Sequence, residues 1–451
     1  MAPGKQLVRY RVCADSMMRK TVQDGLAETS DAKANAVHVK ITGLQPGRAY
    51  FYQFYYGDEE SAIGRTRTSS PNDAGARIAL ASCQHWESGF FAAYRDMADW
   101  QPDCVIHIGD YIYEGGPGTL GASLRDVGGG ERRLFETVRL HDSNETVSLW
   151  DYRNRYAQYR TDPDLQAAHA AAPWIVAMDD HELDNNWAGE VPQDPEKQTA
   201  LEFRLRRYAA FKAYYEHMPI EAPPILKEGI ATLQLYDRYR FGPAAVHMLD
   251  TRQYRSDQSC GDGRKPYCAD ALDPKRTLLG HDQEAWLAKG LKRSDAPFNI
   301  IASQVWFTPY RYSEASAPPV TNLDSWDGYP AARERLMGAL AADVANPVFL
   351  TGDWHTAMAS TVHETAFDTG SRRLGHEIAG SSISSGCPWA KAMEDTREAN
   401  PHVSYLNGNK RGYLRTTLSA ATCEAEFRVV DDSGRADSVV RTDHHYRTTD
   451  I

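Results

Sequence analysis

Residues 105–114 read Val-Ile-His-Ile-Gly-Asp-Tyr-Ile-Tyr-Glu, an apolar run that ends in glycine, aspartate and tyrosine. Short apolar runs of this kind are typical of strands buried on both faces. Gly109 then predicts a tight turn, and Asp110 and Tyr113 lie three residues apart on it, so both side chains can reach one ion. The stretch therefore predicts a buried strand that carries polar ligands at its carboxyl end, where layered α/β proteins bind their ligands.

Three more short apolar runs end in chemically reactive side chains. Their endings are Ser82-Cys83-Gln84-His85, Asp179-Asp180-His181-Glu182 and Thr351-Gly352-Asp353-Trp354-His355. Helical patterns separate the runs, at residues 90–99, 149–160, 198–216, 283–294 and 331–344. Buried strands that alternate with helices predict an α/β layered fold. We expect the four endings to meet at one edge of the sheet.

Residues 1–70 follow a different pattern, in which apolar and polar residues alternate without a helical period. Candidate strands occupy residues 8–12, 36–41 and 50–56, and turn residues occupy 43–47. Strands this close together predict part of a small β-sandwich, although three or four strands are too few to close one. We therefore expect a partial sandwich domain at residues 1–70 and a second domain at residues 71–451.

The composition is that of an ordinary globular protein, with 451 residues of which 42% are hydrophobic and 25% are charged. The net charge of −11 excludes a global basic footprint for nucleic acid. No apolar stretch approaches the ~20 residues of a membrane-spanning helix. Met1 is followed by polar residues, so no export signal is visible, which predicts either an internal chain or a missing leader.

Two loops each leave two interpretations open. Cys260 and Cys268, two of the seven cysteines, flank a polar loop and would form a disulfide in an oxidising compartment, but spacing alone leaves their pairing open. The glycine-rich residues 115–130 predict either a plain surface linker or a functional lid.

The types of the candidate ligands narrow the kind of metal site. Carboxylates, an imidazole, a phenolate and a thiolate together favour a hard or borderline metal pair over a structural zinc site. Two metals that share a bridging aspartate lie ~3.5–4 Å apart and can clamp the oxygens of a transferring phosphoryl group. A tyrosine ligand favours Fe(III), because phenolate is a hard anionic donor.

Taken in order, these motifs resemble those of the alkaline phosphatase D family of calcineurin-like metallophosphatases, over roughly residues 36–430. The other matching stretches are residues 203–215, Leu249-Asp250-Thr251-Arg252-Gln253-Tyr254-Arg255, residues 324–329 and Gly412-Tyr413. The resemblance implies a four-layer α/β/β/α core after a partial fibronectin-III-like β-sandwich, and a periplasmic or secreted location. It also implies that the first strands of that leading domain, and a twin-arginine leader, are missing here.

The resemblance further implies a site that holds Fe(III) and Ca²⁺. The iron ligands would be Cys83, Asp110, Tyr113 and His355. Asp110 would bridge to calcium, which Asp180 and Asp353 would also bind. The motifs are similar to those of the purple acid phosphatases too, but Cys83 replaces an aspartate there, and Asp180 and Asp353 replace an asparagine and a histidine. Carboxylates in place of a neutral amide and an imidazole favour Ca²⁺.

Four further residues are candidates for catalysis. His181 could stabilise the transition state or protonate the leaving alkoxide, or it could be a structural histidine bonded to a neighbouring loop. Arg252 could present a bidentate fork to phosphate oxygens, or it could form a salt bridge with a nearby aspartate. Asn185 or Asn186 could donate to the phosphoryl group or bind metal through oxygen, and the sequence does not say which.

The sequence thus predicts a hydrolase of phosphoric mono- and diesters in which a metal-held hydroxide attacks phosphorus. Its expected partners are phosphate esters, without specific nucleic-acid binding. One alternative is a phospholipase D-like phosphodiesterase on lipid headgroups, whose pocket the aromatic-rich residues 310–329 would shape. Another is a non-catalytic module that docks a partner through its N-terminal strands. An iron oxygenase is disfavoured, because these motifs provide no triad of two histidines and one carboxylate.

Overall fold

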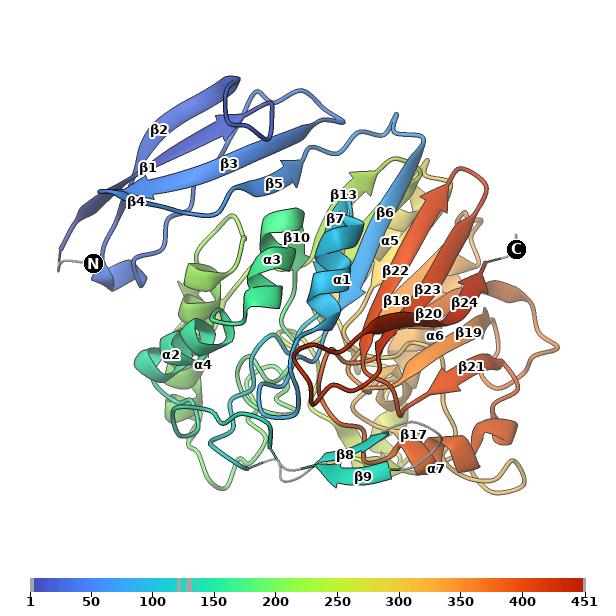
Figure 1. The fold of residues 1–451 in the computed structure, drawn as a ribbon. Coiled ribbons are helices and arrows are strands. Elements are labelled where there is room, and N and C mark those ends of the chain that lie inside the picture. Colours follow the sequence, from blue (N-terminus) through green and yellow to red (C-terminus); the bar gives the residue numbers. More distant parts are fainter. Residues whose placement is uncertain (1–3, 120–122, 127–131, 136, 449–451) are drawn as a thin grey trace.

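The computed structural model describes residues 4–119, 123–126, 132–135 and 137–448. Figure 1 shows a mixed α/β molecule with several sheets, which confirms the predicted fold class at that level. Within the glycine-rich stretch at 115–130, residues 120–122 and 127–130 lie outside the described residues, so the choice between linker and lid stays a prediction. None of the helices in the described ranges is long and apolar enough to cross a membrane.

One large sheet has six strands, and its three strands nearest the catalytic motifs run parallel. In spatial order the strands are β10 (Trp174–Val176), β7 (Cys104–His107), β6 (Gly75–Ala81), β22 (Gly412–Ser419), β23 (Cys423–Val430) and β24 (Val440–Arg447). All four residues of β7 are buried, as the apolar run predicted.

The other large sheet has seven strands, of which β14, β16, β18 and β20 are parallel neighbours. In spatial order the strands are β13 (Asp237–Phe241), β14 (Ala244–Met248), β16 (Phe298–Ala302), β18 (Pro347–Thr351), β20 (Arg373–Ala379), β19 (Ala357–His363) and β21 (Val403–Asn407). Short pairs join β8 (Ser123–Asp126) with β9 (Arg132–Phe135), β11 (Ile225–Lys227) with β12 (Ile230–Thr232), and β15 (Arg264–Lys265) with β17 (Thr321–Asn322).

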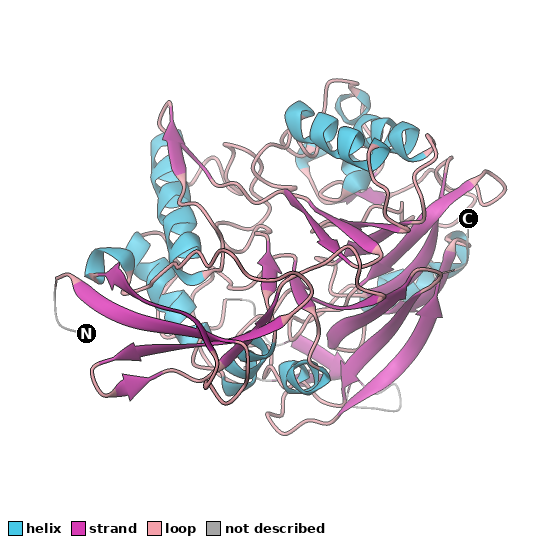
Figure 2. Cartoon of the chain, turned by 90° about the horizontal axis from the view of Figure 1, so that it is seen from above, coloured by secondary structure: helices cyan, strands magenta, loops and turns pink. Residues whose placement is uncertain are grey.

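The helices lie on the outer sides of these two sheets, with strands between them (Figure 2). The helices are α1 (Ala93–Trp100), α2 (Leu149–Tyr159), α3 (Pro163–Ala171), α4 (Ala200–His217), α5 (His281–Lys292), α6 (Pro330–Leu340) and α7 (Ala390–Asp395). One core cluster joins α1–α4 to the six-stranded sheet, and another joins α5 and α6 to the seven-stranded sheet. A third cluster lies between the sheets and includes Leu80, Val246 and Val348.

Local sequence explains where the longer helices begin. Thr199 and Glu202 form a reciprocal capping box at the start of α4, and Ser148 and Asp151 do the same for α2. All five predicted helices are present; the short α7 was not predicted, and neither was α3. Its signal was available, because Asp162 caps a helix whose first residue is Pro163.

The N-terminal residues form a five-stranded sheet beside α3 (Figure 1). Its strands are β1 (Gln6–Cys13), β2 (Thr21–Thr29), β3 (Ala49–Tyr56), β4 (Glu59–Glu60) and β5 (Gly64–Arg67). The predicted strands at 8–12 and 50–56 are present, but the one predicted at 36–41 is wrong. There His38 stacks on Tyr215 of α4 with ring centroids 4.2 Å apart, so this segment packs on a helix, while β2 pairs with β1.

Candidate metal centre and active site

The four strand endings meet at the edge where the two large sheets adjoin. The ends of β6 and β7 are tied together, because the Cys83 N–H donates to Gly109 O at 3.2 Å and the Gln84 N–H donates to Asp110 O at 3.0 Å. Possible ligand atoms of Cys83, Asp110 and His355 lie within 4.8 Å of one another. The same holds for Asp179, Asp180 and Asp353, and for Asp110 with Asp180 and His181. All six proposed metal ligands except Tyr113 therefore belong to such groups.

Four of these residues have a backbone conformation that side chains rarely adopt. The φ angles are 57° at Cys83, 55° at Asp110, 63° at Asp353 and 50° at His355. Each left-handed residue with a Cβ costs roughly 1–2 kcal/mol. Strain of this kind concentrates at functional sites, where the surrounding structure holds it in place. Its presence at the ends of three separate strands marks this edge of the sheets as functional.

Cys83, Tyr113 and His355 form one half of the centre, which we call the mixed-donor cluster. The Tyr113 hydroxyl lies 2.9 Å from Asp110 Oδ2, 3.4 Å from His355 Nε2 and 2.7 Å from Ser385 Oγ. Tyr113 thus contacts two of the predicted iron ligands, Asp110 and His355. Burial raises the pKa of the Tyr113 phenol and of the Cys83 thiol well above their usual ranges, and nearby Asp110 adds to both shifts.

The other contacts of this cluster leave one ring nitrogen of His355 able to bind a cation. His355 Nδ1 lies 2.6 Å from Gly386 O, which fixes its proton there and leaves Nε2 as the basic nitrogen. Burial lowers the pKa of His355 to about 3, with Arg411 contributing, so the ring is neutral. A cation would displace the protons of the thiol and phenol, as metal binding to such groups does.

Asp179, Asp180 and Asp353 form the other half, which we call the carboxylate cluster; Asp110 adjoins both halves. Burial and the neighbouring aspartates raise the pKa of Asp353 well above its usual range. Arg252 offsets part of this charge: its Nε donates to Asp179 Oδ1 at 2.5 Å and its two terminal nitrogens donate to Asp324 at 3.0 and 2.9 Å.

Arg252 therefore takes the salt-bridge arrangement that was the alternative to a phosphate-binding fork. The side chain is fully buried, and its guanidinium edge is occupied by Asp324. Its remaining neighbour is Asp180, whose Oδ2 lies 3.8 Å away. The fork of Arg252 thus binds a carboxylate here, as the salt-bridge alternative expects, and direct contact with phosphate stays a prediction.

Glu182 fastens the ligand loops to each other. Its buried carboxylate accepts from the backbone N–H groups of Asp110 at 3.0 Å, Tyr111 at 2.6 Å and Asp179 at 2.9 Å. Gly109 permits this close approach, because a Cβ there would lie 2.3 Å from the Asp179 Cβ. Both residues stand in the motifs quoted from the sequence, but their roles became visible only once the β7 and β10 loops were placed together.

His181 lies between the metal ligands and the solvent. Its Nδ1 is 2.7 Å from Glu114 Oε2, and its ring stacks on Tyr113 with centroids 4.1 Å apart. Burial alone would lower the pKa of His181, but the charges of Glu114, Asp180 and Asp110 outweigh it and raise that pKa well above its usual range. With Nδ1 held by Glu114, Nε2 is the nitrogen left for a proton transfer.

Asn185 and Asn186 differ in what their side chains do. The Asn186 amide donates to Asp262 Oδ2 at 2.6 Å, and its backbone N–H donates to Asp180 Oδ2 at 2.8 Å. Asn185 instead lines a cavity of about 830 Å³. His181, Tyr113, Glu114, Lys197 and Arg206 line the same cavity. Of these two asparagines, Asn185 therefore borders the cavity, whereas the Asn186 side chain is bonded to Asp262.

Aromatic residues gather on the other side of Asp353. Trp306, Tyr310, Tyr312 and Trp354 line a small cavity together with Asp353. Tyr310 and Tyr312 belong to residues 310–329, which the phospholipase D-like alternative assigned to its pocket, and that assignment stays a prediction. Ser385 was missed altogether, because the serine-rich segment after β20 carries no recognisable ligand pattern.

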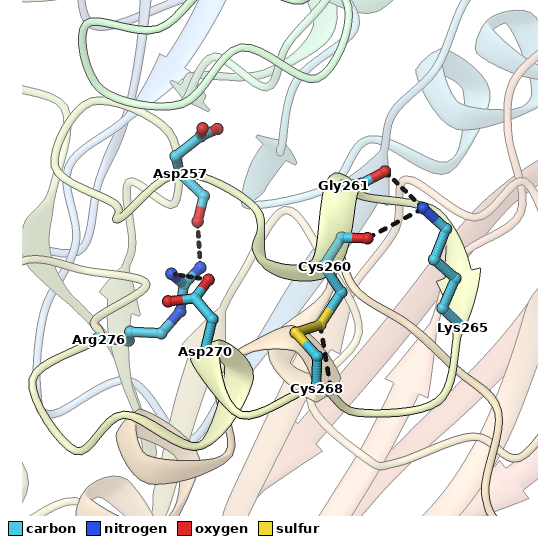
Figure 3. Close-up of a disulfide and its surroundings, with 7 residues drawn as sticks. All are labelled: Asp257, Cys260, Gly261, Lys265, Cys268, Asp270 and Arg276. Atoms are coloured by element: carbon cyan, nitrogen blue, oxygen red, sulfur yellow. Dashed lines mark hydrogen bonds and ion pairs between the residues drawn. A yellow bond between two sulfur atoms is a disulfide. The ribbon is translucent and has the colours of Figure 1, made fainter.

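Cys260 and Cys268, whose pairing the sequence left open, form a disulfide with the two Cα atoms 5.8 Å apart. Figure 3 shows that Lys265 reaches back over the ring, where its Nζ donates to Cys260 O at 3.0 Å and to Gly261 O at 2.8 Å. β15 lies within the ring and pairs with β17, and Asp262, also within the ring, accepts from the Asn186 amide, so the disulfide stabilises a loop at the margin of the centre.

Comparison with known proteins gives one consistent result. The sequence model of the PhoD-like phosphatase matches residues 78–427, and that of the PhoD-like phosphatase N-terminal domain matches residues 2–70. The chain is 41% identical over 431 residues to alkaline phosphatase D of Bacillus subtilis (strain 168), covering 94% of this chain and 71% of that protein. A solved structure of PhoD superposes with a TM-score of 0.92 at 39% identity, covering 100% of this chain and 84% of that one.

Proposed function

The chain belongs to the PhoD-like phosphatase family, and from this premise we propose the identity of its metals, its catalytic residues and its location. It is a metal-dependent phosphoesterase of the alkaline phosphatase type. The observation that carries the proposal is the meeting of a thiol, a phenol, an imidazole and several carboxylates in one buried place.

The mixed-donor cluster suits Fe(III). Cys83, Asp110, Tyr113 and His355 offer one sulfur, one imidazole nitrogen and two anionic oxygens, and Gly386 already directs His355 Nε2 toward Tyr113. Phenolate and carboxylate are hard donors, so the oxidised ion is favoured. Burial keeps the Cys83 thiol and the Tyr113 phenol protonated in the absence of metal. Buried acidic groups of this kind are typical of a site in which a bound cation replaces their protons.

The carboxylate cluster suits Ca²⁺. Asp110, Asp180 and Asp353 supply oxygen donors, which a hard cation prefers. Asp179 and Asp324 are held by Arg252, so we assign them to positioning and not to the metal. When bound, the two cations supply an activated water and neutralise charge on the phosphoryl oxygens.

The remaining chemistry falls to His181 and Asn185. His181 is oriented by Glu114, and its free Nε2 would donate a proton to the departing oxygen of the ester. Asn185 would donate its amide to a phosphoryl oxygen from the wall of the cavity. The cavity is lined mostly by polar and charged side chains, which favours water-soluble phosphate mono- and diesters over lipid headgroups.

Three further proposals concern the fold, the domains and the location of the protein. The helix–sheet–sheet–helix packing supports assignment to the four-layer calcineurin-like fold. The N-terminal sheet supports a fibronectin-III-like domain at residues 1–70, followed by a catalytic domain at residues 71–451. The Cys260–Cys268 disulfide supports a periplasmic or secreted location, because such bonds persist in oxidising compartments.

Metal analysis combined with two assays tests the proposal. Unstripped protein should contain iron and calcium, and it should hydrolyse a monoester or a diester of the same phenol. It should also show a visible charge-transfer band with phenolate modes in its resonance Raman spectrum. Tyr113→Phe should abolish the band, whereas Tyr111→Phe should keep it, because the Tyr111 hydroxyl contacts His169 instead. Metal-replete protein that hydrolyses neither ester would refute the assignment.

A further inference from the structure

A second group of possible metal ligands lies next to the catalytic centre. None of its three residues is among those proposed to bind iron or calcium or to take part in catalysis. One ring nitrogen each of His85 and His141 and one carboxylate oxygen of Glu87 lie within 4.8 Å of one another. All three side chains are buried, with at most 3% of their surfaces exposed. The His85 ring packs edge-on against Tyr113 with centroids 4.7 Å apart, so the group adjoins the mixed-donor cluster without belonging to it.

The surroundings of His141 indicate that a ligand is missing from this group. Its Nδ1 is buried without a hydrogen-bond partner in the part of the chain that the structure describes. The nearest carboxylate oxygen, Glu87 Oε1, is 3.8 Å away, which is too long for a hydrogen bond to an imidazolium. Buried polar atoms almost always have a partner, so a ring nitrogen and a carboxylate oxygen that face each other across this gap require an explanation.

The surroundings of the two imidazoles are those of metal-binding histidines. Such histidines hold one ring nitrogen on a neighbouring oxygen, which orients the ring and leaves the other nitrogen for the metal. His85 Nδ1 lies 2.7 Å from Ser88 Oγ, and His141 Nε2 lies 3.1 Å from the Tyr159 hydroxyl. When each ring donates its N–H to that hydroxyl oxygen, His85 Nε2 and His141 Nδ1 are the nitrogens that remain for a metal.

Glu87 is oriented as well. Its carboxylate accepts from the backbone N–H of Gly118 at 2.9 Å and from that of His141 at 2.9 Å. It therefore joins the loop after β6 to two further segments of the chain. Each of these hydrogen bonds uses one lone pair, and a carboxylate has about four sites to offer, so it retains capacity for a cation.

We propose that His85, Glu87 and His141 bind one divalent transition-metal ion, best represented by Zn²⁺. Two imidazole nitrogens and one carboxylate oxygen are a set that zinc binds, with water in the fourth position. The ion would fasten the loop after β6 to His141, while Glu87 also holds Gly118. Gly115 and Gly116 beside that glycine line the substrate cavity, so the ion would fix one wall of it.

Zinc titration of the iron- and calcium-loaded protein tests this proposal. After removal of free zinc, the wild type should retain one equivalent, and X-ray absorption at the zinc edge should show two imidazole ligands. Glu87→Gln and His141→Gln should each weaken zinc binding at least tenfold while iron and calcium contents stay unchanged. His402→Gln is the matched control, because its Nδ1 is also buried without a partner among the described residues and His402 belongs to no three-ligand group there.

Three results would overturn the proposal. Zinc could be retained equally by the wild type and by both variants, or not retained at all, or retained only as iron is lost, which would place it in the catalytic centre. If a variant does not fold, anomalous diffraction at the zinc edge from wild-type crystals decides the matter. Density between His85, Glu87 and His141 supports the site, and density elsewhere alone refutes it.

Discussion

The mixed-donor cluster and the carboxylate cluster differ in how their buried polar groups are stabilised. The Tyr113 hydroxyl contacts the Ser385 hydroxyl and donates to the Asp110 carboxylate, and His355 is held by the Gly386 carbonyl. The carboxylate cluster instead contains a buried arginine, which binds Asp179 and Asp324 through three nitrogens. The first cluster is therefore stable without a metal when its groups are protonated, whereas the second depends on a positive charge that the chain itself provides.

This difference predicts that the two halves can be damaged separately. Losing a ligand from the mixed-donor cluster should remove iron and leave the fold intact, because the remaining groups are neutral. Losing charge balance in the carboxylate cluster should affect both calcium binding and the free energy of unfolding, because unpaired buried carboxylates are costly.

The largest effect is expected from Cys83→Ala. A thiolate ligand should be lost together with iron, and activity should fall by more than the ~10–100-fold that loss of a ligand's hydrogen-bonding partner costs. Iron content, the visible band and turnover measure this. Cys104→Ala is the control, because Cys104 is equally buried on β7 and belongs to no candidate metal group of the described residues. A disulfide at Cys83 in active protein, found by mass mapping, would contradict the prediction.

Removal of calcium should stop turnover while the mixed-donor cluster keeps its metal. A chelator selective for calcium should abolish hydrolysis with the visible band unchanged, because the carboxylates and not the thiol and phenol bind that ion. Added Ca²⁺ should restore the rate. Full recovery with Zn²⁺ alone would show that the carboxylate cluster does not prefer a hard cation, and loss of the band with calcium would show that the two halves are not separable.

The sequence predicted the ligands of both clusters but not what holds them. Strand endings such as 109–114 could be recognised because each apolar run is local and its polar residues follow at once. The ends of parallel strands in one sheet must also meet at one edge, which applies to β6, β7 and β10. The positions of Cys83, Asp110 and Asp180 follow from these two facts, whereas that of His355, after β18 of the other large sheet, depends on how the two sheets pack.

Contacts between segments that are distant along the chain could not be predicted from such local patterns. Ser385 lies about 300 residues after Cys83 along the chain, yet its hydroxyl donates to Cys83 O at 2.7 Å. Asp324 faces Arg252 across a similarly nonlocal contact, and the choice between a phosphate fork and a salt bridge depended on it. The failed strand at 36–41 has the same cause, because packing of His38 on Tyr215 overrides its alternating pattern.

His181 stands where the two clusters meet, and its replacement should affect substrates unequally. A proton donor contributes about 10²–10⁴-fold when the leaving group is a poor one and much less when it is a good one. His181→Asn should therefore slow hydrolysis of alkyl phosphates far more than that of nitrophenyl phosphate, with iron and calcium retained. Glu114→Gln should give the same pattern more weakly, since Glu114 orients the ring. Equal losses on all leaving groups would remove the acid role from His181.

The smallest change in activity, and the one that best separates the clusters, is expected from Arg252→Lys. Lysine keeps a positive charge near Asp179 but cannot bind Asp324 with two parallel N–H groups. Calcium affinity should therefore fall by about 10–100-fold, as it does when a partner of a metal ligand is lost, while kcat at saturating calcium stays near that of the wild type. Arg252→Ala should in addition destabilise the protein by about 3–5 kcal/mol, because it leaves buried carboxylates unpaired.

Arg333→Lys is the control, since Arg333 is also buried and paired with an aspartate, Asp327, at 2.6 Å. If Arg252→Lys instead raises KM for every substrate at saturating calcium, the guanidinium binds phosphate after all, and the carboxylate cluster must rearrange when substrate enters.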